Sequence, residues 1–159
     1  MRNETSHTIT VSVFLLSVFL SAAPAQAQKP TNQAPIDDST ARPRATKTDL
    51  EIVKRARALL DSPAKWNRAD NRVCPSGAKT VSLYCALQIA TTEITGKPEH
   101  RGAALQETRF VVDEIAGDRN YSHRLMDYNN DPTTTFDDIQ EVLNIVERVI
   151  ALRLRGQKP

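Results

Sequence analysis

One apolar stretch, residues 74–90, most constrains what this chain can fold into. Eight of the ten residues from Val81 to Ala90 are hydrophobic, and the stretch also contains both cysteines of the chain. A segment that is apolar on most faces is buried on most faces. We therefore expect a central helix, about Lys79 to Thr95, that ends at Gly96 and is covered by other helices.

The residues before this stretch predict an exported protein. An apolar run from Val11 to Leu20 is followed by Ala25-Gln26-Ala27, which places small residues at the positions that a signal peptidase reads. We predict a signal peptide over residues 1–27, cleaved after about Ala27. Residues 28–47 contain three prolines and almost no large apolar residue, which favours a disordered linker.

Amphipathic patterns on both sides of the central segment predict an all-α fold: a compact bundle of four to five short helices in one domain, residues 48–155. The first helix is expected to begin at a Thr48–Glu51 capping box. The last is expected to begin at Thr135 and to bury one apolar stripe. Between these two we expect the central helix and two further helices, over residues 100–116 and 121–128.

The two cysteines, Cys74 and Cys85, are eleven residues apart. In an oxidising compartment an even pair favours a disulfide, which here would join a long loop to the central helix. Two separate buried thiols remain an alternative. A redox or zinc role is disfavoured, because the spacing is not Cys-x-x-Cys and only two histidines follow the predicted signal peptide.

A long connection precedes the central helix and carries the only tryptophan, Trp66. This side chain either folds back as a lid over the core or stands exposed as a ligand anchor. Basic residues beside an aromatic ring suit an anionic partner. The candidate binding residues are Trp66, Arg68, Arg72, Asp127, Asn130 and Asp131.

The sequence gives little support to catalysis. It has no Gly-x-Ser-x-Gly motif and no glycine-rich phosphate loop, and it predicts neither a metal nor another cofactor. The alternative to a binding protein is a small hydrolase-type enzyme that uses His123, Asp127 and Asn130 in a cleft before the last helix. A passive structural protein of the cell envelope is a third possibility.

The order of Trp66, Cys85-Ala86-Leu87, Asn130-Asp131-Pro132 and Thr135 before an apolar last helix resembles a family of small bacterial helical domains of unknown function. The resemblance covers about Asp49 to Leu152. It implies a helical fold and no known activity. The chain departs from the family pattern at Gln88, where a glycine is expected, and at Tyr128, which stands near an expected tryptophan.

These observations together predict a soluble, extracytoplasmic binding or interaction module. Its partner is expected to be a protein or an anionic component of the envelope. Nucleic acid is disfavoured, because the 21 basic and 19 acidic residues nearly balance. No membrane span is expected after the signal peptide is removed, because no second apolar run is long enough.

Overall fold

The computed structural model describes residues 42–157. The predicted all-α class is confirmed: these residues form helices and one isolated β-bridge, with no longer strand. None of the described helices is both long and apolar enough to cross a membrane. The helices are α1 (Lys47–Leu59), a short 3-10 helix η1 (Pro63–Lys65), α2 (Leu83–Thr95), α3 (Ala103–Ala116), α4 (Arg124–Asn130) and α5 (Phe136–Gly156).

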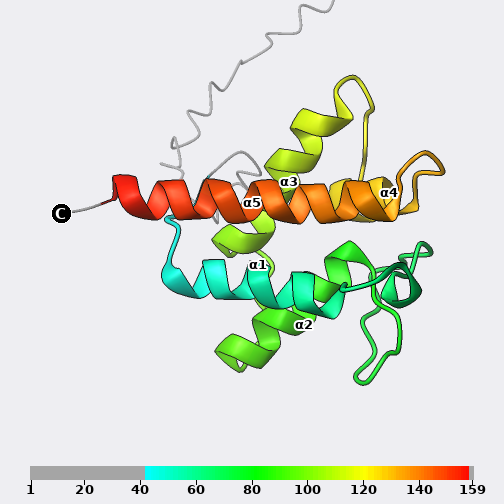
Figure 1. Ribbon diagram of the computed structural model, residues 1–159, viewed down its shortest axis with the longest axis horizontal. Helices are drawn as coiled ribbons and strands as arrows, with labels where there is room; N and C mark the ends of the chain where they lie inside the picture. The colour runs from blue at the N-terminus through cyan, green and yellow to red at the C-terminus, as the bar shows by residue number, and fades with distance from the viewer. Residues whose placement is uncertain (1–41, 158–159) are drawn as a thin grey trace, which may run out of the picture. The chain divides into compact units, whose positions relative to one another are not determined.

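The apolar stretch is buried as expected. Every residue from Val81 to Gln88 is buried, and α2 becomes exposed only in its last turn. The helix with the most extensive contacts to other helices is nevertheless α1, which packs on α2, α3 and α5. Figure 1 shows α1 and α5 side by side and running in opposite directions, with α2 and α3 crossing them.

The first helix begins earlier than the sequence indicated. Helix α1 begins after Thr46, whose hydroxyl accepts the Asp49 N–H at 3.2 Å while the Asp49 carboxylate accepts the Thr46 N–H at 2.9 Å. The expected cap at Thr48 is therefore wrong by two residues. Asp49 also accepts the Ala104 N–H at 3.0 Å, so one carboxylate caps α1 and the start of α3. The contact of Asp49 with α3 favours a start of α1 after Thr46 over the predicted start at Thr48.

Residues 42–46 fell within the predicted linker, and they lie against the helices. Glu107 of α3 is fully buried and forms ion pairs with Arg42 and with Arg153 of α5. Arg153 also donates to the Pro43 carbonyl at 2.6 Å, and Ala45 is buried. The predicted signal peptide and the linker up to residue 41 lie outside the described residues.

Two inner helix boundaries also differ from the prediction. Helix α2 begins at Leu83, not Lys79, because Val81 pairs with the backbone beside Trp66 and Ser82 then caps the helix. Helix α4 lies two to three residues later than expected, which places Asp127 and the following asparagines on a helix. The predicted start of the last helix is confirmed, with Thr135 and Asp138 forming a capping box.

The apolar stripes of the outer helices also pack inward. Ile139, Val142, Leu143, Val146 and Ile150 of α5 are all fully buried, and Val149 at the edge of the stripe is half-buried. In α3, Val111 and Val112 are buried, whereas Ile115 is exposed.

Candidate functional site

The α1–α2 loop, residues 60–82, is held in place by one buried side chain of α4. Asn129 has no exposed surface. Its Oδ1 accepts hydrogen bonds from the Trp66 indole N–H at 2.8 Å and from the Leu83 N–H at 3.0 Å. Its Nδ2 donates to the Asn67 carbonyl at 2.9 Å and to Asn130 Oδ1 at 3.1 Å. The amide thus uses both of its donors and both acceptor positions inside the protein.

Asn130 fixes the next part of the loop through its amide. Its Oδ1 accepts the Asp70 N–H at 2.7 Å, and its Nδ2 donates to the Asp70 carbonyl at 2.8 Å. The side chain therefore pairs with the backbone of Asp70 as a neighbouring strand would. This predicted binding residue lies in the site, but its polar atoms already hold the loop.

Trp66 lies as a lid, the first of the two placements considered for it. Its ring is half-buried and packs against Phe136 with the ring centroids 6.2 Å apart. The Arg68 guanidinium covers the ring at 5.1 Å and donates to the carbonyls of Asp131 and Pro132, each at 3.1 Å. Arg68 itself remains exposed.

Asp131 follows α4 and organises the turn before α5. Its Oδ1 accepts the Thr133 hydroxyl at 2.6 Å and the Thr133 N–H at 2.8 Å, while its Oδ2 accepts the Tyr121 hydroxyl at 2.7 Å. Arg119 lies 3.4 Å from the same Oδ2. The hydrogen bonds from Thr133, followed by that from Tyr121, hold the pKa of Asp131 well below its usual range.

The two tyrosines beside this turn are shifted in the opposite direction. Burial, with a smaller effect from the hydrogen bond to Asp131, raises the pKa of Tyr121 to about 12. Burial and the nearby charge of Asp138 raise the pKa of Tyr128 to about 12. Both phenols therefore stay protonated at neutral pH, and neither provides a nucleophile or base there.

Arg72 has an unusual backbone conformation. It is the only described residue other than glycine with a positive φ, at 62°. Its N–H donates to the buried Asp70 carboxylate at 2.7 Å. Its guanidinium lies 6.0 Å from the centre of the Tyr84 ring on α2, and the side chain is exposed. Tyr84 in turn contacts the exposed His100, with Oη 3.2 Å from Nδ1.

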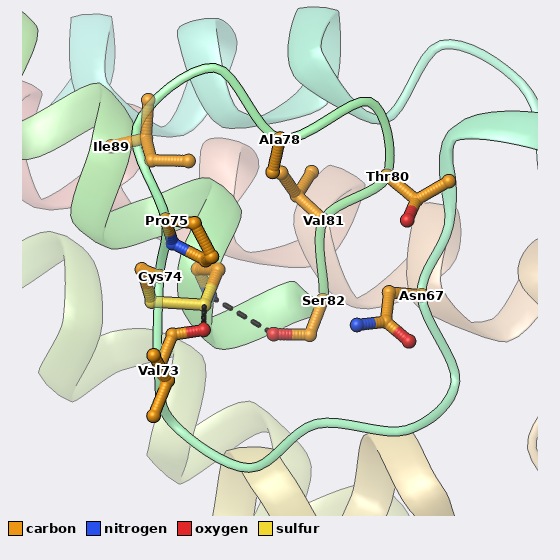
Figure 2. Close-up of a pocket in the computed structure, with 10 residues that line it drawn as sticks. Asn67, Val73, Cys74, Pro75, Ala78, Thr80, Val81, Ser82 and Ile89 are labelled. Atoms are coloured by element: carbon orange, nitrogen blue, oxygen red, sulfur yellow. Dashed lines mark hydrogen bonds between the residues drawn. A yellow bond between two sulfur atoms is a disulfide. The ribbon is translucent and has the colours of Figure 1, made fainter.

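The expected disulfide is present. Cys74 and Cys85 are bonded, with their Cα atoms 5.2 Å apart, and they tie the second half of the loop to the first turn of α2. Figure 2 shows the bridge beside Val73 and Pro75, with Ser82 and Ile89 around the same small cavity. The cavity measures about 20 Å³, which is room for one water molecule and no more.

Two residues of the hydrolase alternative use their side chains to bind backbone groups. The Asp127 carboxylate accepts the backbone N–H of His123 at 2.7 Å, at the start of the short helix α4. The Asn130 amide pairs with Asp70 in the loop. Within residues 42–157, no group of three or more His, Cys, Asp or Glu side chains is placed to hold a metal ion.

A family of unknown function (DUF6197) matches residues 44–149 of this chain. The chain belongs to that family. The match covers every helix described above except the last turns of α5, and it agrees with the resemblance noted from the sequence. No curated protein and no solved structure matches the chain.

Some residues that organise the site were not predicted. Asn129 is its most highly bonded side chain, and Tyr121 and Thr133 hold Asp131. The signal available in the sequence was the adjacent Asn129-Asn130 pair. An asparagine amide that becomes buried needs hydrogen-bond partners inside the protein. Nothing in the sequence identified those partners, which lie about 60 residues away in the loop.

Proposed function

We propose that this protein is an exported binding module whose α1–α2 loop presents a rigid cationic surface to an anionic component of the cell envelope. The observation that carries the proposal is the conformation of Arg72. A positive φ costs a residue with a Cβ roughly 1–2 kcal/mol, and such conformations concentrate at functional sites. Glycine or asparagine would adopt this backbone conformation at lower cost but would carry no charge. The presence of arginine at this position therefore indicates a role for its guanidinium.

The rigidity of the loop supports this assignment. A loop of this length with little secondary structure is commonly functional in a compact domain. Here Asn67, Asp70 and Asn71 each accept, on a side-chain oxygen, the backbone N–H two residues further on. These three successive Asx turns act with the disulfide to fix the backbone, so little conformational entropy is lost on binding.

The positive charges of Arg68 and Arg72 also support the proposed anion-binding surface. No carboxylate within residues 42–157 forms an ion pair with Arg68 or Arg72. The neighbouring Val73 is 65% exposed and adds apolar surface. The planar guanidinium donates a pair of hydrogen bonds to phosphate or carboxylate oxygens. An anion can therefore bind here without displacing an existing ion pair.

Export is supported by the sequence of residues 1–27 and is compatible with the disulfide. Disulfides persist outside the reducing cytoplasm. An extracytoplasmic location would also bring the loop into contact with phosphate-bearing polymers and lipids of the envelope.

The test uses the variant Arg72→Gly, which removes the charge and keeps the backbone conformation. We expect it to be as stable as the wild type or more stable, by up to about 1 kcal/mol. We expect its binding to long-chain polyphosphate or to phosphatidylglycerol vesicles to be weaker, measured by co-sedimentation at low salt. Lys97→Ala is the control, because it removes one exposed positive charge from outside the loop.

Equal binding by wild type and Arg72→Gly would refute the proposal. Equal weakening by Lys97→Ala would also refute it, because attraction would then follow net charge alone and not the loop. Binding to the polymer only, or to the vesicles only, would identify which source supplies the anion.

A further inference from the structure

A second surface lies on α5, on the side turned away from the core. Asn144, Arg148, Ala151, Leu152 and Arg155 recur at spacings of one, three or four residues, so they share one helix face. This face lines an open depression of about 460 Å³ together with Arg57 of α1, and a second open depression of about 500 Å³ lies beside it between α1 and the first half of α5. The depressions share Arg57 and Glu147 as lining residues, and together they form one groove, called here the α1–α5 groove.

The groove carries more positive than negative charge. Lys54, Arg57, Arg148 and Arg155 line it, against Glu147 and Asp61. The two carboxylates are already engaged: Glu147 pairs with Arg57 at 2.7 Å and lies 4.0 Å from Lys54, and Asp61 pairs with Lys65 at 2.6 Å. No carboxylate of the described residues pairs with Arg155.

An apolar side chain lies between two of these cations. Leu152 is 59% exposed, one turn beyond Arg148 and just before Arg155. Arg148 pairs only with Glu141, and both of these side chains are largely exposed, so the pair is weak and exchangeable. The groove thus offers two available guanidinium groups with an aliphatic contact between them.

We propose that the α1–α5 groove binds an acidic peptide segment of a partner protein. Arg148 and Arg155 are seven residues apart, which is about 10 Å along the helix axis. In a peptide with the polyproline II conformation, residues three apart lie on the same face and are separated by a similar length, about 9 Å. The segment that fits therefore has the pattern acidic-x-x-acidic, with an aliphatic residue between the acidic positions to contact Leu152.

The shape of the surface favours a peptide over the other large anions. A membrane-binding helix face needs a broad apolar stripe that enters the lipid, and here one leucine stands beside a recessed ion pair. Nucleic acid requires a continuous basic surface, and Glu147 interrupts this one. A peptide can place its carboxylates on the two arginines and avoid Glu147. The proposal concerns a different surface from the loop and does not depend on it.

The probe is a fluorescein-labelled peptide, Ser-Glu-Leu-Ser-Glu-Ser with blocked ends, measured by fluorescence anisotropy at low salt. We expect Arg148→Ala with Arg155→Ala to weaken binding about tenfold or more, since two exposed charge pairs are lost. Leu152→Ser is expected to weaken it as well. The matched control is Arg55→Ala with Lys97→Ala, which removes the same charge from exposed positions outside both the groove and the loop and is expected to leave the affinity unchanged.

Four results would overturn the inference. The first is the absence of saturable binding of this peptide by the wild type. The second is that the control variant weakens binding as much as the groove variant, which would mean attraction by overall charge. The third is equal binding of a peptide with lysine in place of both glutamates. Preference of the groove for polyphosphate over the peptide, lost in the groove variant, would assign it to a phosphate polymer and would also refute the proposal.

Discussion

Replacing Asn129 by alanine tests how the loop is held. The change removes the acceptor for Trp66 Nε1–H and for the Leu83 N–H, and the donor to the Asn67 carbonyl. The Leu83 group is buried, and a buried donor without a partner costs about 1–3 kcal/mol. The other two groups are partly reached by water and contribute about 0.5–1.5 kcal/mol each.

The expected loss in the free energy of unfolding is therefore about 2–6 kcal/mol before one correction. Alanine is a better helix former than asparagine by about 0.5 kcal/mol, and Asn129 lies in α4. We expect a net loss of about 1.5–5.5 kcal/mol in urea unfolding. Trp66 is the single tryptophan, so its fluorescence reports this region, and circular dichroism reports the helices.

Two further variants sharpen the test. Asn144→Ala on α5 is the matched control, because Asn144 is half-buried on a helix and makes no hydrogen bond with the described residues through its side chain. Its unfolding free energy should stay within about 0.5 kcal/mol of the wild type. Trp66→Phe combined with Asn129→Ala should show a coupling of about 1 kcal/mol. A loss below 1 kcal/mol for Asn129→Ala, or no coupling with Trp66, would refute the reasoning.

Three other perturbations have defined outcomes. Replacing Cys74 and Cys85 by serine should cost about 3 kcal/mol in urea unfolding, the chain-entropy value for a loop of this size. Glu107→Gln should cost about 1–3 kcal/mol by the same measurement, because its two arginine partners are partly exposed and keep some hydration. The folded-state pKa of Asp131 is lowered, so its contribution to stability is present above its unfolded pKa of about 4 and is lost as the pH falls below that value. Urea midpoints between pH 6 and pH 3 should therefore fall less steeply for Asp131→Asn than for the wild type.

Local patterns were enough to predict the helices. Thr135 and Asp138 form the capping box of α5, and both are close in sequence to the stripe that they introduce. The burial of most residues of α2 follows from its apolar composition alone. These features depend on residues within one or two turns of each other, which is the range where sequence periodicity carries information.

Contacts between distant segments explain what the sequence did not predict. Asp49 caps α3, which begins more than 50 residues later. This long-range contact favours a start of α1 after Thr46, two residues before the predicted cap at Thr48. Arg42 belongs to a segment with linker composition, yet the buried Glu107 holds it in place. The sequence of such a segment predicts that its charged residues are solvated. The partner of Arg42 could not be predicted locally, because it is 65 residues away.

The polar residues singled out from the sequence differ in how far the fold already uses them. A ligand at Asn130 or Asp131 would have to displace short internal hydrogen bonds that hold the loop and the turn before α5, and each replaced bond lowers the net affinity. A ligand at Arg72 displaces no hydrogen bond or ion pair between its guanidinium and residues 42–157, and the backbone cost of its conformation is already present in the free protein. If this domain binds an anion, the difference in cost therefore favours Arg72 over Asn130 and Asp131.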